Sequence, residues 1–176
     1  MNITKNKKGF TLVELLAVIV ILALIMSIAI VSIGGVLKSS RESTFKETAL
    51  SIINGVKMQL TVANQLKSGT YYFTESLLDS DNELPFGGKI NYTASGGTAV
   101  PGTNNLLRRI TTENTTCTKD STSYVTITNT NEKYTFKICL TPKPLDGTSF
   151  SSSQKYIYGS EEDLYKSDST VVKDVS

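Results

Sequence analysis

A single carboxylate lies in the most apolar part of this sequence. Residues 10–37 contain one charged side chain, Glu14, and three lysines occupy the first eight positions, ahead of Gly9. A carboxylate in an apolar environment is costly unless a cation pairs with it, and in the simplest alternative it lies among lipid headgroups and does nothing further. The pattern by itself leaves two interpretations of Glu14 open, an ion pair and an inert position among headgroups.

The rest of the sequence offers little catalytic chemistry. Histidine is absent, which excludes imidazole bases, and two cysteines are too few for a Cys-rich zinc module. No serine or threonine has the lysine or carboxylate spacing of an activated nucleophile, so we expect neither an enzyme nor a cofactor. Without the three leader lysines, 15 basic residues face 16 acidic ones, which does not favour a nucleic-acid partner. The one basic pair, Arg108-Arg109, is more typical of ordinary surface than of a phosphate contact.

The apolar segment predicts a membrane-spanning helix. Leu15–Leu37 contains 23 residues without a charge, and such a helix covers about 35 Å, enough for a hydrocarbon layer of about 30 Å. A buried core helix is disfavoured because every face is apolar. The lysines before it predict a cytoplasmic N-terminus. An ordinary signal peptide is the other alternative, with small residues around Ala29 imitating a cleavage site, but its apolar region is about half as long.

The helix is expected to continue into an amphipathic one over residues 38–67. Gly34-Gly35 is the point where it could bend, and Lys67-Ser68-Gly69 is its expected end. The apolar stripe is too narrow for lipid and predicts packing against the rest of the chain. It consists of Phe45, Ala49, Ile52, Val56, Leu60, Ala63 and Leu66.

Short strands are predicted beyond residue 68. Tyr124–Thr128 and Lys133–Leu140 alternate in polarity on either side of a turn-forming stretch, so they predict a hairpin. Ser160 followed by Asp163 predicts a capping box that opens a short helix. Further strands are expected at Thr70–Phe73, Ile90–Ala94 and Thr170–Val175.

The residues around the lone carboxylate carry a family resemblance. The run Lys7-Lys8-Gly9-Phe10-Thr11-Leu12-Val13-Glu14, followed by Leu15-Leu16, places a glycine before an apolar helix and a carboxylate four residues after Phe10. It resembles type IV prepilins and the related pseudopilins of type II secretion and competence systems. The close match covers roughly residues 5–37, and the remainder of the chain resembles the family in architecture alone.

The resemblance implies processing and assembly through named residues. A membrane prepilin peptidase would cut between Gly9 and Phe10 and N-methylate Phe10. Glu14 would then pair with the amino terminus of Phe10, in its own subunit or in an adjacent one, and so set the register of assembly. The apolar helices would pack side by side, with small residues for close approach: Ala17, Ala23, Ala29 and Gly34.

The resemblance also implies a disulfide between Cys117 and Cys139, because the family often has one in its C-terminal region. Two free thiols are the alternative. With the hairpin turn centred between Thr130 and Asn131, Thr122 would lie opposite Cys139, so the bridge would not be a simple cross-strand pair.

The expected fold is α+β, a long N-terminal helix with a small antiparallel sheet packed on its outer half. The expected function is a structural subunit of a type IV pilus for adhesion, motility or aggregation, stored in the cytoplasmic membrane and then exported into a surface filament. Its expected partners are copies of itself and other pilins, the prepilin peptidase, and the assembly platform with its ATPase. A secretion or competence pseudopilin is one alternative, and a membrane-anchored binding or enzyme domain that does not polymerise is another. The expected segments are a leader at 1–9, an apolar helix at 10–37, an amphipathic helix at 38–67 and a β-rich head at 68–176.

Overall fold

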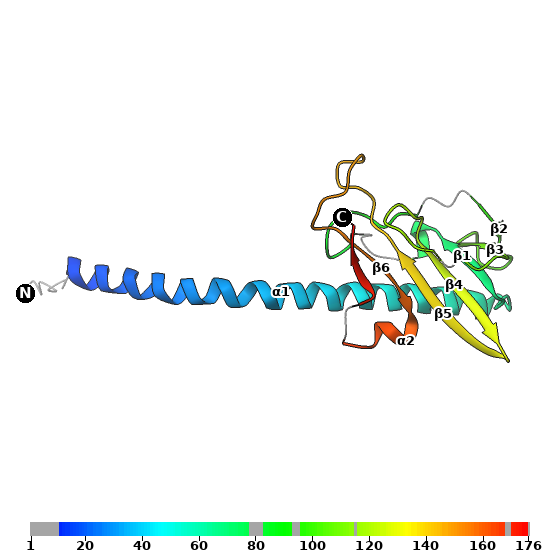
Figure 1. Cartoon of the computed structure of the whole chain (residues 1–176), viewed down its shortest axis with the longest axis horizontal. Helices are drawn as coiled ribbons and strands as arrows, with labels where there is room; N and C mark the ends of the chain where they lie inside the picture. Colours follow the sequence, from blue (N-terminus) through cyan, green and yellow to red (C-terminus); the bar gives the residue numbers. More distant parts are fainter. Residues whose placement is uncertain (1–10, 78–82, 93–95, 115, 168–169, 176) are drawn as a thin grey trace, which may run out of the picture. The chain divides into compact units, whose positions relative to one another are not determined.

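A computed structural model describes residues 11–77, 83–92, 96–114, 116–167 and 170–175 (Figure 1). Their internal contacts divide the chain into two units, Met1–Ser40 and Arg41–Ser176. The fold is α+β: one long N-terminal helix and one antiparallel sheet of seven strands, as the sequence predicts.

The sheet has the order β2-β3-β1-β4-β5-β6-β7, and every neighbouring pair is antiparallel. The short helix α2 follows β6 directly, and a 3₁₀ turn η1 follows β1. The elements are α1 (Leu12–Val62), β1 (Gly69–Phe73), η1 (Glu75–Leu77), β2 (Thr98–Ala99), β3 (Leu107–Ile110), β4 (Tyr124–Thr130), β5 (Lys133–Leu140), β6 (Lys155–Ser160), α2 (Glu161–Leu164) and β7 (Val172–Asp174).

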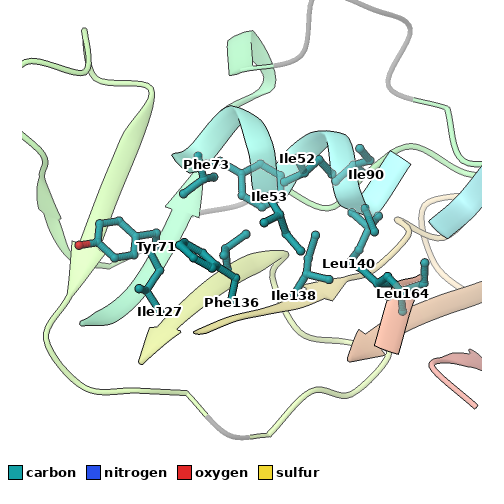
Figure 2. Close-up of a cluster of buried hydrophobic side chains, with 14 of the residues drawn as sticks. Ile52, Ile53, Tyr71, Phe73, Ile90, Ile127, Phe136, Ile138, Leu140 and Leu164 are labelled. Atoms are coloured by element: carbon teal, nitrogen blue, oxygen red, sulfur yellow. The ribbon is translucent and has the colours of Figure 1, made fainter. Parts of the chain in front are cut away.

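The core lies between one face of the sheet and the half of α1 that belongs to the second unit. Figure 2 shows Ile52 and Ile53 of the helix above Ile138 and Leu140 of β5, and all four are fully buried. The predicted stripe positions are buried as far as Leu60, because residues three or four apart share a helix face, and Lys46 and Ile53 beside them are buried as well. Burial of apolar surface at about 25 cal/mol per Å² is the main force that holds helix to sheet.

Helix α1 ends five residues before its expected end at Lys67. Asn64 adopts a left-handed backbone with φ of 52°. Its N–H bonds to the carbonyl of Thr61, and the N–H of Gln65 bonds to the carbonyl of Leu60 at 2.8 Å. This is a Schellman termination, with Asn64 in the place that glycine usually takes.

The predicted hairpin is confirmed, but its turn is centred one residue later than expected, so the partner of each residue is shifted by two positions. Asn131 and Glu132 form a two-residue turn in which both have positive φ, so Thr130 pairs with Lys133. The residue opposite Cys139 is consequently Tyr124 rather than Thr122.

Other strand predictions need correction. No strand forms in the described part of 90–94; Ile90 makes one isolated bridge to Pro142, and a proline cannot donate the next ladder bond. The last strand is shorter than expected, at Val172–Asp174, and strands β2, β3 and β6 were not predicted. The Ser160–Asp163 capping box is confirmed: the Ser160 hydroxyl accepts the backbone N–H of Asp163.

Candidate processing and assembly site

Glu14 lies in the first turn of α1, where it closes a reciprocal pair of bonds with Thr11. The Thr11 backbone N–H and hydroxyl both donate to Glu14 Oε2 at 2.9 Å, and the Glu14 N–H donates to the Thr11 hydroxyl at 3.3 Å. Thr11 is therefore the N-cap of α1 and Glu14 its third residue, the arrangement of a capping box. The Thr-x-x-Glu spacing was visible in the sequence, but its meaning for the start of the helix was not predicted.

Both Thr11 bonds use the same oxygen of Glu14. Among the described residues, the other oxygen, Oε1, accepts no hydrogen bond and contacts no cation. The cap therefore orients the carboxylate and leaves half of it open to a further donor. A carboxylate can accept about four hydrogen bonds, so capping and pairing with an ammonium group are compatible.

Over residues 12–30 and 33–37, the apolar half of α1 buries none of its large side chains in this chain. Leu12 is 81% exposed and Ile28 72% exposed, although such residues normally lie inside a protein. By length and composition the helix can cross a membrane. A helix that is apolar on every face is stable only when lipid or other helices surround it.

Small residues interrupt this surface. A Cβ atom added at Gly34 or at Gly35 would meet nothing within 4 Å, so packing within this chain does not require glycine at either position. Both are helical in α1, at a cost in helix stability of about 1 kcal/mol each relative to alanine. Close approach of another helix would account for them.

The proposed cleavage position, Gly9 and Phe10, lies outside the described residues. Thr11, the N-cap of α1, follows Phe10 directly in the sequence. The site residues that the structure brings together are therefore Thr11 and Glu14.

Cys117 and Cys139 form a disulfide with a Cα–Cα distance of 5.8 Å. Cys139 is in β5, and Cys117 lies in the segment that leads to β4 and crosses the sheet face turned away from α1. Hydrogen bonds hold the same segment: the Tyr124 hydroxyl donates to the carbonyl of Thr116 at 2.7 Å, and the Thr126 hydroxyl donates to that of Asn114 at 3.1 Å. The disulfide thus fastens Cys117, together with Asn114 and Thr116, over the outer face of the sheet.

The arginine pair is engaged in the fold. Arg108 donates to the carbonyls of Gly96 and Gly97, and Arg109 donates twice to that of Ser68. Both guanidinium groups fix loops beside β3, and both side chains are half-buried, which corrects the expectation of an ordinary solvated surface. Within the described ranges, no three carboxylate or cysteine side chains converge where they could hold a metal ion.

Comparison with known proteins finds one family model that matches the N-terminal part of the chain. Residues 4–36 match the family model described as the prokaryotic N-terminal methylation motif. No curated protein and no solved structure matches the chain. The match covers Gly9, Phe10 and Glu14 together with most of the exposed apolar half of α1, so the same residues carry the motif and the unusual surface.

Proposed function

We propose that this chain, which carries the N-terminal methylation motif of type IV pilins and pseudopilins, is a structural subunit of a type IV pilus. The precursor would sit in the cytoplasmic membrane through the apolar half of α1 and enter a surface filament after processing. Filaments would then serve adhesion, motility or aggregation. The chemistry of the protein is self-association, and no enzymatic step is assigned to it.

Processing would act just before the Thr11 cap. Prepilin peptidase would cut between Gly9 and Phe10 on the cytoplasmic side, where the leader lysines hold the site, and would methylate the new amino terminus of Phe10. Glycine suits the position before the cut because its backbone fits an enzyme cleft without a side chain. Cleavage removes three positive charges from the end of the helix and leaves the apolar segment in place.

Assembly would then use the open oxygen of Glu14. An ammonium group at Phe10, in the same or an adjacent subunit, offsets the desolvation of this carboxylate, and Thr11 holds the carboxylate in position. Only a neighbour at the correct axial offset completes the pair. Side-by-side packing of the apolar helices would exchange lipid contacts for protein contacts, aided by Ala17, Ala23, Ala29 and Gly34.

The head domain fits a filament exposed outside the cell. Its disulfide constrains a surface segment, and such bonds persist in oxidising compartments. This feature favours a durable pilus over a transient pseudopilus of a secretion or competence system. Copies of the chain, other pilins, the assembly platform and its extension ATPase are the proposed partners.

The observation that carries this proposal is the match of the methylation motif to residues that begin an exposed apolar helix. Mass spectrometry of the protein from its native host tests it. We expect a mature chain that begins at N-methylated Phe10, and electron microscopy of sheared surface material should show filaments that contain it. An unprocessed chain beginning at Met1 would overturn the proposal, and a processed chain without filaments would favour a pseudopilin.

A further inference from the structure

A shallow basic groove lies on the head domain between two segments that are distant in sequence. It has a volume of about 420 Å³ and is lined by residues on either side of Gly87-Gly88 and by residues 143–145. Lys89 and Lys143 are both exposed at its rim, Glu83 is the one acidic residue of the lining, and Leu145, 59% exposed, forms an apolar wall. The groove therefore combines a net positive charge with an apolar side.

The walls of the groove are held rigidly by one buried side chain. Gln154 has no exposed surface, and its Nε2 donates to the carbonyls of Gly87, at 3.2 Å, and Lys143, at 2.9 Å. The backbone N–H of Lys143 donates to the carbonyl of Lys89 at 2.6 Å. A Cβ at Gly88 would lie 2.4 Å from Gln154 Nε2, so glycine is required there. Both lysines thus project from a backbone that is fixed before any partner arrives.

The two lysines lack anionic partners in the part of the chain that the structure describes. Among the described residues, neither ammonium group takes part in an ion pair or a hydrogen bond, whereas Lys57, Lys155 and Lys166 all do. Two such groups on one rigid rim favour an anion of complementary spacing.

The exposed acidic turn α2 is a suitable partner. It contains Glu161, Glu162 and Asp163 in its only turn. Glu161 is paired with Lys57, and Asp163 is held by Lys166 at 2.8 Å. Glu162 is different: its side chain is 87% exposed, and its distance to Lys166 is 3.8 Å. Its carboxylate is therefore the one most available to a neighbour.

The groove and α2 of one chain cannot meet. Gln154 precedes the first residue of β6, and Ser160, the last residue of β6, caps α2. Five steps along a strand, at about 3.3 Å each, separate the two ends by about 17 Å. In Figure 1 the loop that follows β5 and the helix α2 lie on opposite sides of the sheet domain.

We propose that the Lys89–Lys143 groove of one subunit receives Glu162 and the α2 turn of a second copy of this chain. The inference rests on the proposed function and names a contact within the filament. Because the two surfaces differ and lie at opposite ends of β6, the contact is head-to-tail and can repeat without closing, as a filament requires. A single exposed ion pair is weak, so this contact alone does not join subunits that are still in the membrane. It strengthens the filament only where packing of the apolar helices brings many copies of the contact together.

Charge reversal in the full chain, expressed in its native host, tests this contact. We expect Lys89→Glu with Lys143→Glu to lower the amount of sheared filament at least tenfold. Adding Glu162→Lys to that double variant should restore it to within about threefold of the parent. The matched control is Lys67→Glu with Lys133→Glu, two exposed lysines outside the groove, which should stay within twofold. An unchanged cell-associated pool with its native disulfide shows that each variant folds.

Cysteine cross-linking gives an independent readout. A chain with both Lys143→Cys and Glu162→Cys should form a ladder of covalent multimers in sheared filaments, and neither single variant should. Dimers from a single variant would indicate a symmetric contact and overturn the inference. So would a loss of filaments that Glu162→Lys fails to restore, since the groove would then bind another anion. Normal filaments from the double charge reversal would overturn this contact alone, whereas a parent chain without filaments would overturn the proposed function as well.

Discussion

Thr11 and Glu14 cap the start of α1 reciprocally, through one oxygen of the carboxylate. The Thr11 N–H and hydroxyl reach Glu14 Oε2, and the Glu14 N–H reaches the Thr11 hydroxyl. This relationship gives Glu14 a local role that exists in a single chain, before any subunit contact. The hydrogen bonding and the charge of the Glu14 side chain can therefore be tested one at a time, because different substitutions remove each of them.

The first prediction concerns these two properties. Glu14→Gln keeps an acceptor at the third helix position, where glutamine also serves in capping boxes, but removes the charge. We expect it to lower the amount of sheared filament at least tenfold, because a neutral amide cannot offset the ammonium group of Phe10. Thr11→Ala removes the cap, at a cost of about 1 kcal/mol in helix stability, and keeps the charge. It should retain filaments within about threefold of the parent.

Mass spectrometry of the N-terminus controls for processing in both variants. The opposite ranking, with Glu14→Gln assembling normally and Thr11→Ala failing, would show that capping is the whole role of Glu14. Normal filaments from Glu14→Leu would contradict both roles.

The second prediction concerns the disulfide. Cys117 and Cys139 are 22 positions apart, and in the chain-entropy model a bond that closes such a loop stabilises the folded state by about 3 kcal/mol. The double variant Cys117→Ser, Cys139→Ser should therefore lose about that amount of unfolding free energy, measured by denaturant unfolding of the purified full chain in detergent. The apolar half of α1 should be unaffected, because it belongs to the other unit and contains neither cysteine.

Reduction of the parent protein is the matched control for this substitution. It should give the same loss of stability as the double serine variant, since both remove the same constraint. Equal stability of oxidised and reduced protein would contradict the prediction. It would mean that the hydrogen bonds of Thr116 and Asn114 hold the segment without the bond between the sulfurs.

Local patterns explain which parts of this fold could be predicted. The run without charges from Leu15 to Leu37 predicts a helix by composition alone, and the Ser160-x-x-Asp163 spacing predicts a cap that depends on four adjacent residues. The stripe from Phe45 to Leu60 reports the face that packs on the sheet. Each of these patterns involves residues that are close together in the sequence.

The parts that were missed depend on pairing between distant residues. Strand β3 carries Arg108 and Arg109, a pair that indicates solvent exposure, and it becomes a strand by pairing with β1, where Thr70 lies opposite Ile110. The bonds from its arginines to loop carbonyls complete this arrangement. Of the site residues, the cysteine pair was predicted from the sequence and is confirmed as a disulfide, and the assembly role of Glu14 stays a prediction. The role of Thr11 required the geometry of the helix start.

The third prediction concerns the end of α1. Asn64 occupies a left-handed backbone conformation that asparagine and glycine tolerate and β-branched residues do not. Asn64→Gly should leave stability within about 0.5 kcal/mol of the parent, whereas Asn64→Val should cost about 1–2 kcal/mol. Denaturant unfolding compares the two, and equal stability of the valine variant would show that the helix can continue past Ala63. The sequence predicted the end at Lys67, ahead of Gly69, because glycine is the commoner residue just past the end of a helix.

The fourth prediction concerns the acidic side of α2. The Lys166 ammonium group, followed by the Ser160 hydroxyl, lowers the pKa of the Asp163 carboxyl to about 2. An unfolded aspartate titrates near 3.9, so the folded state binds the proton more weakly than the unfolded one. The stabilisation from Asp163 is therefore complete above about pH 4 and is lost as the pH falls toward about 2.

Carboxyl carbon NMR of the full chain in detergent should give an Asp163 midpoint near 2, well below that of an ordinary aspartate. Lys166→Met should raise the midpoint more than Ser160→Ala does, because the lysine is the larger cause. A parent midpoint near 4, or a larger effect of the serine substitution, would contradict this assignment of the bonds that hold α2.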